Sequence, residues 1–514
     1  MEMTENRRIA LNIVATYGRS LYALVIGLFC GRWMLMALGQ TDYGLYGVVG
    51  GLTAFISFFN GIMSGAVGRF YAVSVGAQKL HGDSGLEECR AWFTTAVIIH
   101  TVLPIVLMLI GYPVGEWAVR NFLTIPLERI ESCVWVWRFV CITCFLGMFS
   151  VPYNAMYGAH QYIAELTIYS FITTTLNALF LYYMITHPGV WLTRYALAQL
   201  ILGLLPNVII TIRACFLFPE CRFGWKYIHC WPRIRGLCNY GFWNAWGVLG
   251  AMLRGQGIAI LVNKYFGATA NAGIAVGTNL SGQCNSLAGS MLGAFSPAIF
   301  NAWGAHDYTR ARMMAFQTCK IGTILILIFS LPLSLEVEHV LKLWLVNPPP
   351  YAVGICLCVM AMTVIDKMAV GQMICVNANG KVARYQAFLG TSLVCTLPIA
   401  WILMLIGCGV YSVGYAMVAT MCVCASGRVW FARKLVGMSA RYWFSHVFLP
   451  IAGIALTAGA CGLVPRFWFE PSFGRICLTT VLVECVLLPL TWLLLLTQEE
   501  KEFVMQRIRR FVKR

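Results

Sequence analysis

The sequence contains few charged residues, and the acidic ones are the scarcest. Of its 514 residues, 11% are charged and only 20 are acidic, whereas 59% are hydrophobic and the mean hydropathy is +0.74. About a quarter of the residues in an ordinary soluble domain are charged. There is also no long polar stretch for a soluble domain, because apolar runs long enough to cross a bilayer recur from end to end. The composition therefore predicts an all-α, polytopic membrane protein.

Several motifs of enzymes and pumps are also missing. No G-x-x-x-x-G-K-[ST] phosphate-binding loop occurs, so ATP is not expected to drive the protein. The 21 cysteines lie mostly inside apolar runs and show no zinc or disulfide spacing. The longest expected outer loop, 113–131, holds Glu116, Glu128 and Glu131 without metal-ligand spacing. These absences argue against a membrane-embedded glycosyltransferase, polymerase or ligase, so we expect a non-enzyme without a cofactor.

The apolar runs divide into fourteen candidate spans, an even number that places both termini on one side. The second and eighth spans are long and rich in Gly, Ser and Asn, so we expect them to bend. The spans lie near 10–37, 43–75, 91–112, 132–157, 164–186, 193–218, 237–263, 270–300, 316–336, 350–376, 385–407, 410–431, 446–464 and 475–497.

The distribution of Lys and Arg predicts which side of the membrane holds the termini. With the N-terminus inside, the cytoplasmic segments carry 23 basic residues and the opposite loops carry 7. The positive-inside rule therefore predicts cytoplasmic N- and C-termini. Much of the net charge of +17 then belongs to the inner membrane face, and nucleic-acid binding is not needed to explain it. The segment 498–514 is basic and amphipathic, as expected of a cytoplasmic tail on anionic lipid.

Two short similarities within the chain predict a duplication. Asn154 and Gly158 resemble Asn377 and Gly380, with the asparagines 223 residues apart, and the Gly39 region resembles that of Gly267 at an offset of 228. We expect a first six-helix lobe at 1–218, a cytoplasmic linker at 219–236 and a second lobe at 237–431. Two additional transmembrane helices at 432–497 complete the expected architecture. Because six is even, the lobes run parallel, with a substrate site expected between them.

Basic residues inside the spans indicate the chemistry of that site. They outnumber the acidic ones, Asp366 and Glu484, and buried charges need partners. An anionic substrate in a water-filled cationic lumen would supply the partner, although arginines can also anchor to backbone carbonyls or to Asp366. Isolated Ser, Thr, Asn and Gly residues are more typical of helix packing. The candidate lumen residues are Arg19, Arg32, Asn60, Arg69, Arg254, Asn279 and Lys367.

The segment from Asn6 to Ala72, with its "ALGQTDYGLYG" and "FNGIMSGAVGRF" elements, resembles bacterial Wzx-type flippases for polysaccharide or O-antigen repeat units. These belong to the multidrug/oligosaccharidyl-lipid/polysaccharide exporter superfamily. The segment "QGIAILVNKYFGATANAGIAVGTNLSGQCNSLAGSMLGAFSPAI" adds to the likeness. The resemblance implies two six-helix lobes plus two helices. It also implies alternating access for undecaprenyl-pyrophosphate-linked oligosaccharides in the bacterial inner membrane, with a polysaccharide polymerase or ligase as candidate partner.

Two other transport functions remain open at this point. A peptidoglycan-precursor flippase would share the fold and the anionic lipid-linked substrate. A multidrug or cation antiporter would need a carboxylate near mid-membrane, for which Asp366 is the candidate despite the adjacent Lys367. Asp366 and Glu484, together with His100, are also the candidates for coupling transport to H⁺ or Na⁺.

Overall fold

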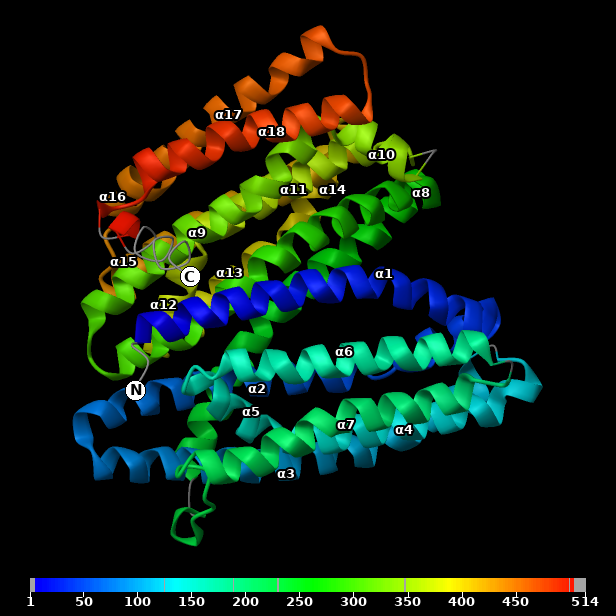
Figure 1. Ribbon diagram of the computed structural model, residues 1–514, viewed down its shortest axis with the longest axis vertical. Coiled ribbons are helices and arrows are strands. Elements are labelled where there is room, and N and C mark those ends of the chain that lie inside the picture. The colour runs from blue at the N-terminus through cyan, green and yellow to red at the C-terminus, as the bar shows by residue number, and fades with distance from the viewer. Residues whose placement is uncertain are drawn as a thin grey trace, which may run out of the picture. The chain divides into compact units, whose positions relative to one another are not determined.

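The computed structural model describes residues 5–123, 125–187, 189–228, 231–345, 348–498 and 500–502. Within these ranges the chain is helical and forms a multi-pass membrane protein (Figure 1). The helices of the first half are α1 (Glu5–Gly51), α2 (Ala54–His81), α3 (Asp83–Trp117), α4 (Ile130–Phe149), α5 (Val151–Ala159), α6 (Ile163–Thr186) and α7 (Leu192–Leu217).

The second half begins with the longest helical stretch of the described chain, α8 (Trp231–Gly304). It continues with α9 (Tyr308–Leu335), α10 (Val337–Leu345), α11 (Ala352–Met368), α12 (Val370–Asn379), α13 (Ala383–Val394), α14 (Thr396–Leu405), α15 (Ser412–Val436), α16 (Ala440–Trp443), α17 (Leu449–Trp468) and α18 (Phe473–Leu490). Short 3₁₀ or π turns lie at Ala118–Phe122, Leu127–Arg129, Trp225–Tyr227, Gly409–Tyr411, Phe444–Phe448 and Thr491–Leu495.

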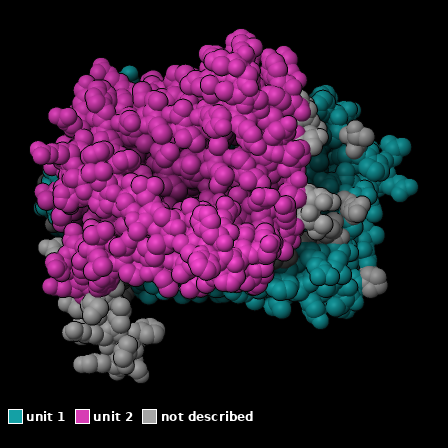
Figure 2. Space-filling model, turned by 90° about the horizontal axis from the view of Figure 1, so that it is seen from above, with its two compact units in different colours: residues 1–242, 293–308 teal, residues 243–292, 309–514 magenta. Residues whose placement is uncertain are grey.

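The chain forms two compact units (Figure 2). Unit 1 comprises residues 1–242 and 293–308, and unit 2 comprises residues 243–292 and 309–514. The end of α8 packs within unit 1, where an added Cβ at Gly304 would lie 1.9 Å from the Val73 carbonyl oxygen. The finer division into lobes, linker, additional helices and tail stays a prediction. From residue 503 onward, the expected basic tail lies outside the described residues.

Eleven helices of the described chain are long and apolar enough to cross a membrane, or twelve if the bent pair α11 and α12 counts as one span. All twelve coincide with expected spans. The two expected spans without such a match are the second and the eighth, which are the ones rich in Gly, Ser and Asn. Both are nevertheless helical, as α2 and the second part of α8. The expected fourteen-helix fold is therefore compatible with the structure.

The first expected span, 10–37, ends next to a break in α1 at Gly39, where the backbone is not helical. α1 continues to Gly51 through a kink at Gly39, whose φ of 73° lies in the left-handed region where glycine has no steric penalty. Beyond the kink, Asp42 is buried and its Oδ1 lies 3.1 Å from Nε of Arg129. This aspartate of the "TDYG" element therefore ties the end of α1 to the turn before α4.

The long stretch α8 reverses direction, as the two expected spans at 237–263 and 270–300 require. Arg254 and Asn285 line the same cavity. They are 31 residues apart, so a straight helix would separate them by about 46 Å. In addition, Ile258 and Ile274 belong to one buried cluster. The two limbs of α8 within unit 2 therefore lie side by side.

The packing within each unit supports the expected duplication. α1 runs along α6 (Figure 1), and Asn12 Nδ2 donates to the Gln161 carbonyl oxygen at 2.8 Å. In unit 2 the first limb of α8 runs along α13, where Gln386 Nε2 donates to Asn244 Oδ1 at 2.6 Å. α4 likewise packs on α7, as α11 packs on α15. The span broken at Ser150 between α4 and α5 has its counterpart in the 46° bend between α11 and α12.

The two additional helices α17 and α18 pack against each other and against α9 (Figure 1). Their shared core includes Ile451, Ile454, Val483 and Leu487. At one end, Arg475 Nη2 of α18 donates to Oε2 of the buried Glu336 at 2.7 Å, between α9 and α10. α17 and α18 are therefore an integral part of unit 2.

Candidate functional site

A polar cavity of about 230 Å³ lies inside unit 2, between the two limbs of α8 and helices α11 and α15. The apolar part of its wall includes Ile258, Ile274 and Val359, and Met417 adds a wall from α15. The polar part is formed by Arg254, Thr278, Ser281, Asn285 and Thr363. The hydroxyl groups of Ser281 and Thr363 form a hydrogen bond of 2.8 Å, which links the second limb of α8 to α11.

Arg254 is the charged residue of this wall. Its side chain is half-buried, and its Nη1 is buried without a hydrogen-bond partner among the described residues. A buried charged donor without an acceptor is energetically costly. The first limb of α8 can present this side chain because Gly250, one turn earlier, packs directly on Gly390 of α13. The cavity thus contains a cationic group that a ligand could satisfy.

A charged cluster lies one helical turn from the cavity wall, at the end of α11. Asp366 Oδ1 is 2.8 Å from Nη1 of Arg428, and its Oδ2 is 3.3 Å from Nζ of Lys367. Arg428 also donates to the backbone oxygen of Asp366 at 3.0 Å. Two cations are therefore paired with one carboxylate, and the cluster as a whole is positive.

Arg428 is the residue of this cluster that the sequence reasoning missed. The positive-inside count assigned it to the cytoplasmic segments, but it is only 6% exposed and lies within the membrane span of α15. The same count included Lys320, which is also buried and donates to the Leu495 carbonyl oxygen at 3.0 Å. The signal that could have identified Arg428 is its place in the small-residue run "CASGR" of α15, a helix that packs on α11, which contains Asp366.

The expected lumen residues of the first half all lie in unit 1. On α1, Asn12 and Thr16 are buried against α6 and its preceding turn, so that part of the polar stripe serves helix packing. Arg19, the next residue of the stripe, donates to Ser170 Oγ at 3.5 Å, while its Nε is buried without a described partner. Arg32 is exposed. No contact between Arg19 and Arg32 occurs among the described residues.

On α2, the two candidates differ in their surroundings. Asn60 is half-buried, and its Oδ1 lacks a hydrogen-bond partner among the described residues. Arg69 is buried, and its guanidinium lies 4.6 Å from the ring centroid of Phe70 and 5.0 Å from that of Tyr240. Such cation–π contacts stabilise a desolvated arginine. A structural role thus accounts for much of the environment of Arg69.

The remaining candidates, Asn279, Lys367 and Glu484, belong to unit 2, and they do not all lie at the same site. Asn279 on α8 is exposed, whereas its neighbour Thr278 lines the cavity. Lys367 is buried beside Asp366 and does not line the cavity. Glu484 on α18 is half-buried, with its Oε1 unpaired among the described residues. No described contact connects Glu484 to the cluster around Asp366.

Comparison with solved structures identifies the fold. The chain matches a MATE crystal structure in the straight conformation with a TM-score of 0.67 at 14% identity, over 84% of this chain and 96% of the other. It matches an outward-facing multidrug-resistance MATE transporter of the MOP superfamily with a TM-score of 0.68 at 13% identity, over 85% and 99%. It also matches a MOP superfamily transporter from Pyrococcus furiosus with a TM-score of 0.66 at 14% identity, over 85% and 99%.

Neither a protein-family model nor a curated protein matches the chain by sequence. At identities of 13–14% the structural likeness shows the fold alone. The chain has the MATE-like fold of MOP superfamily transporters, which confirms the fold class expected from the sequence. The narrower likeness to repeat-unit flippases stays a prediction.

Proposed function

We propose that this protein is an exporter that moves lipid-linked anionic oligosaccharides across the membrane by alternating access. The substrate class is that of undecaprenyl-pyrophosphate-linked repeat units of O-antigen, capsule or exopolysaccharide, moved from the cytoplasmic to the periplasmic leaflet. The protein would lie in a bacterial inner membrane with both termini cytoplasmic. Transport would be driven by an H⁺ or Na⁺ gradient or by downhill flux, and a polysaccharide polymerase or ligase would receive the product.

The single observation that carries this proposal is the unpaired, buried Nη1 of Arg254 in the wall of a polar cavity. Because a guanidinium offers planar pairs of N–H donors, it suits phosphate and carboxylate oxygens. The neighbouring Thr278, Ser281 and Asn285 supply hydroxyl and amide groups for sugar hydroxyls. A cavity with this composition favours an anionic glycan over a lipophilic cation.

The cluster around Asp366 points in the same direction. A cation antiporter needs a carboxylate that is free to bind its cation, but Asp366 is already paired with both Arg428 and Lys367. Binding a cation there would require one of these pairs to separate. For the transporter from Pyrococcus furiosus, reversed polarity of the binding pocket is stated to suggest a different function. The sign of the charge in the cavity is therefore the property to test.

The test is complementation in a bacterium that lacks its own repeat-unit flippase, with surface polysaccharide scored on a gel. Wild type is compared with Arg254→Ala and Arg254→Lys at matched membrane expression. Arg384→Ala is the control, because Arg384 is exposed at the start of α13 and has no ion pair among the described residues. Loss of a charge-assisted hydrogen bond contributing roughly 1.5–3 kcal/mol should reduce transport about 10- to 100-fold.

We expect wild type and Arg384→Ala to restore polysaccharide, Arg254→Ala to lose it and Arg254→Lys to retain part. Full restoration by Arg254→Ala would keep the flippase function but refute the role of this cavity. Failure of wild type, together with acquired resistance to cationic drugs, would identify a multidrug antiporter. Restoration of growth in cells depleted of their lipid II flippase, without O-antigen or capsule, would identify the peptidoglycan-precursor substrate.

A further inference from the structure

A second hollow lies in unit 1, on the surface of α3 and α4. It is a groove of about 770 Å³. Apolar residues spaced three or four apart on the two helices form its walls, and Leu109 at its centre is 72% exposed. The two helices are held together where Trp137 of α4 packs on Gly115 of α3, because an added Cβ at Gly115 would lie 2.1 Å from the indole. The wall residues used below are Leu109, Tyr112, Trp135, Arg138 and Ile142.

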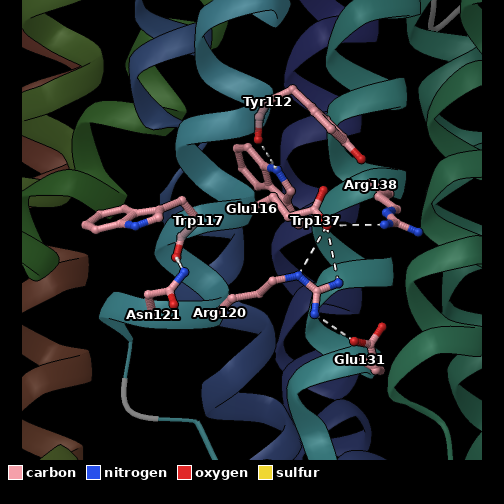
Figure 3. Close-up of polar contacts among 8 residues, drawn as sticks. All are labelled: Tyr112, Glu116, Trp117, Arg120, Asn121, Glu131, Trp137 and Arg138. Atoms are coloured by element: carbon pink, nitrogen blue, oxygen red, sulfur yellow. Dashed lines mark hydrogen bonds and ion pairs between the residues drawn. The ribbon is translucent and has the colours of Figure 1, made fainter.

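One end of the groove is charged (Figure 3). Arg138 Nη2 donates to Oε1 of Glu116 at 3.2 Å, and Arg120 donates to the same oxygen at 3.3 Å and to Glu131 Oε1 at 2.7 Å. The cluster lies between the end of α3 and the start of α4, at the membrane surface that the charge distribution predicts to be the outer one. Two arginines and two glutamates thus form one connected network of ion pairs.

The cluster contains both a cationic and an anionic group that can still bind a ligand. Nε of Arg138 is buried without a hydrogen-bond partner among the described residues, and its guanidinium lies 5.0 Å from the ring centroid of Trp135. The side chain of Glu131 is 71% exposed. An arginine beside a tryptophan at the end of an apolar groove is the arrangement expected where a lipid headgroup meets its acyl chains.

We propose that this groove binds one zwitterionic glycerophospholipid with a primary ammonium, of the phosphatidylethanolamine type. An acyl chain lies along Leu109 and Ile142, the phosphodiester accepts hydrogen bonds from Arg138, and the ammonium donates to Glu131. This site is separate from the cavity at Arg254, and the proposal does not rest on the proposed function.

The balance of charges selects the headgroup. An anionic headgroup such as phosphatidylglycerol would satisfy Arg138 but would offer nothing to Glu116 and Glu131, whose negative charges it would approach. A quaternary ammonium, as in phosphatidylcholine, cannot donate a hydrogen bond to a carboxylate. A primary ammonium next to a phosphodiester matches the paired charges of the cluster.

The experiment is native mass spectrometry of the delipidated full-length protein with phosphatidylethanolamine, phosphatidylcholine or phosphatidylglycerol of identical acyl chains. Arg138→Gln removes the phosphate donor, and Leu109→Trp fills the groove without touching a buried residue. Arg466→Gln is the matched control, an arginine at the predicted outer surface of unit 2 that does not line the groove. Loss of the charged hydrogen bond should weaken phosphatidylethanolamine binding about tenfold.

We expect wild type and Arg466→Gln to retain phosphatidylethanolamine in preference to the other two lipids. Arg138→Gln should lose this preference, and Leu109→Trp should reduce retention of all three lipids. Equal retention of the three lipids by wild type would overturn the choice of headgroup. Unchanged phosphatidylethanolamine retention in both Arg138→Gln and Leu109→Trp would overturn the groove as the site.

Discussion

Replacing Asp366 by Asn tests whether its carboxylate is a structural ion partner or a site for a coupling ion. The substitution keeps the size of the side chain but leaves Arg428 and Lys367 without their common counter-charge, at 2.8 and 3.3 Å respectively. Arg428 is 6% exposed and Lys367 is 8% exposed, so both cations depend on this carboxylate more than on water, although the Asp366 side chain itself is 25% exposed. Removing one partner of a buried ion pair costs roughly 3–5 kcal/mol.

This cost should appear as a lower melting temperature of the purified protein in detergent. Unit 2 is of the size for which roughly 2–4 °C corresponds to 1 kcal/mol, so the expected decrease is on the order of 10 °C. Adding Arg428→Gln to Asp366→Asn removes one of the two stranded cations and should recover part of the loss. The double-mutant cycle then gives a favourable coupling energy between positions 366 and 428.

The opposite result would refute this reasoning. If Asp366→Asn melts at the temperature of wild type, the two ion pairs contribute nothing, and Asp366 is free for another role. If transport in the same variant also becomes independent of the H⁺ or Na⁺ gradient, Asp366 is the coupling carboxylate. The proposed function would then lose the argument from the paired Asp366 and would depend on the cavity at Arg254 alone.

Two further predictions concern helix packing and pH. Gly250→Val should destabilise unit 2 by about 1–3 kcal/mol, because the new Cβ would lie 2.5 Å from the Gly390 carbonyl oxygen. Gly453→Val is the control: an added Cβ there has no neighbour within 4 Å, so this variant should melt close to the wild-type temperature. Equal losses in both variants would show that β-branching, and not the helix crossing, is responsible. Burial raises the pKa of Glu220, but hydrogen bonds from its own backbone N–H and from Gln78, together with the contact with His160, whose Nε2 lies 3.4 Å from Oε1, outweigh burial and leave this pKa lowered. Its stabilising contribution should therefore be present above a pH of about 4.5 and be lost as the pH falls through the lowered folded pKa. Glu220→Gln should then melt at a less pH-dependent temperature than wild type between about pH 5 and pH 3, and parallel melting curves would contradict the role of this carboxylate.

The class of the protein and the positions of most of its spans could be predicted from the amino-acid sequence. Apolar runs separated by short polar segments leave a chain no alternative to transmembrane helices, because an unpaired backbone group in hydrocarbon is too costly. Even the exceptions were visible, since the Gly-, Ser- and Asn-rich second and eighth spans are the ones that lack the apolar character of the others. The short internal similarities around Asn154 and Asn377 also lie where α5 and α12 end, at the turns that lead into the next span of each half.

Which polar residues contact one another depends on how the helices pack, and the sequence does not show it. Asn12 and Arg19 lie on the same polar stripe of α1. Asn12 hydrogen-bonds to the turn before α6, whereas Nε of Arg19 is buried without a hydrogen-bond partner among the described residues. Lys367 and Arg254 look alike as basic residues within spans, but one neutralises Asp366 and the other lines a cavity. Arg428 could not be recognised from hydropathy, because its ion pair joins residues 62 positions apart on two helices. The physical reason is that hydropathy and helical period are local properties, whereas the partner of a charge depends on how the helices pack.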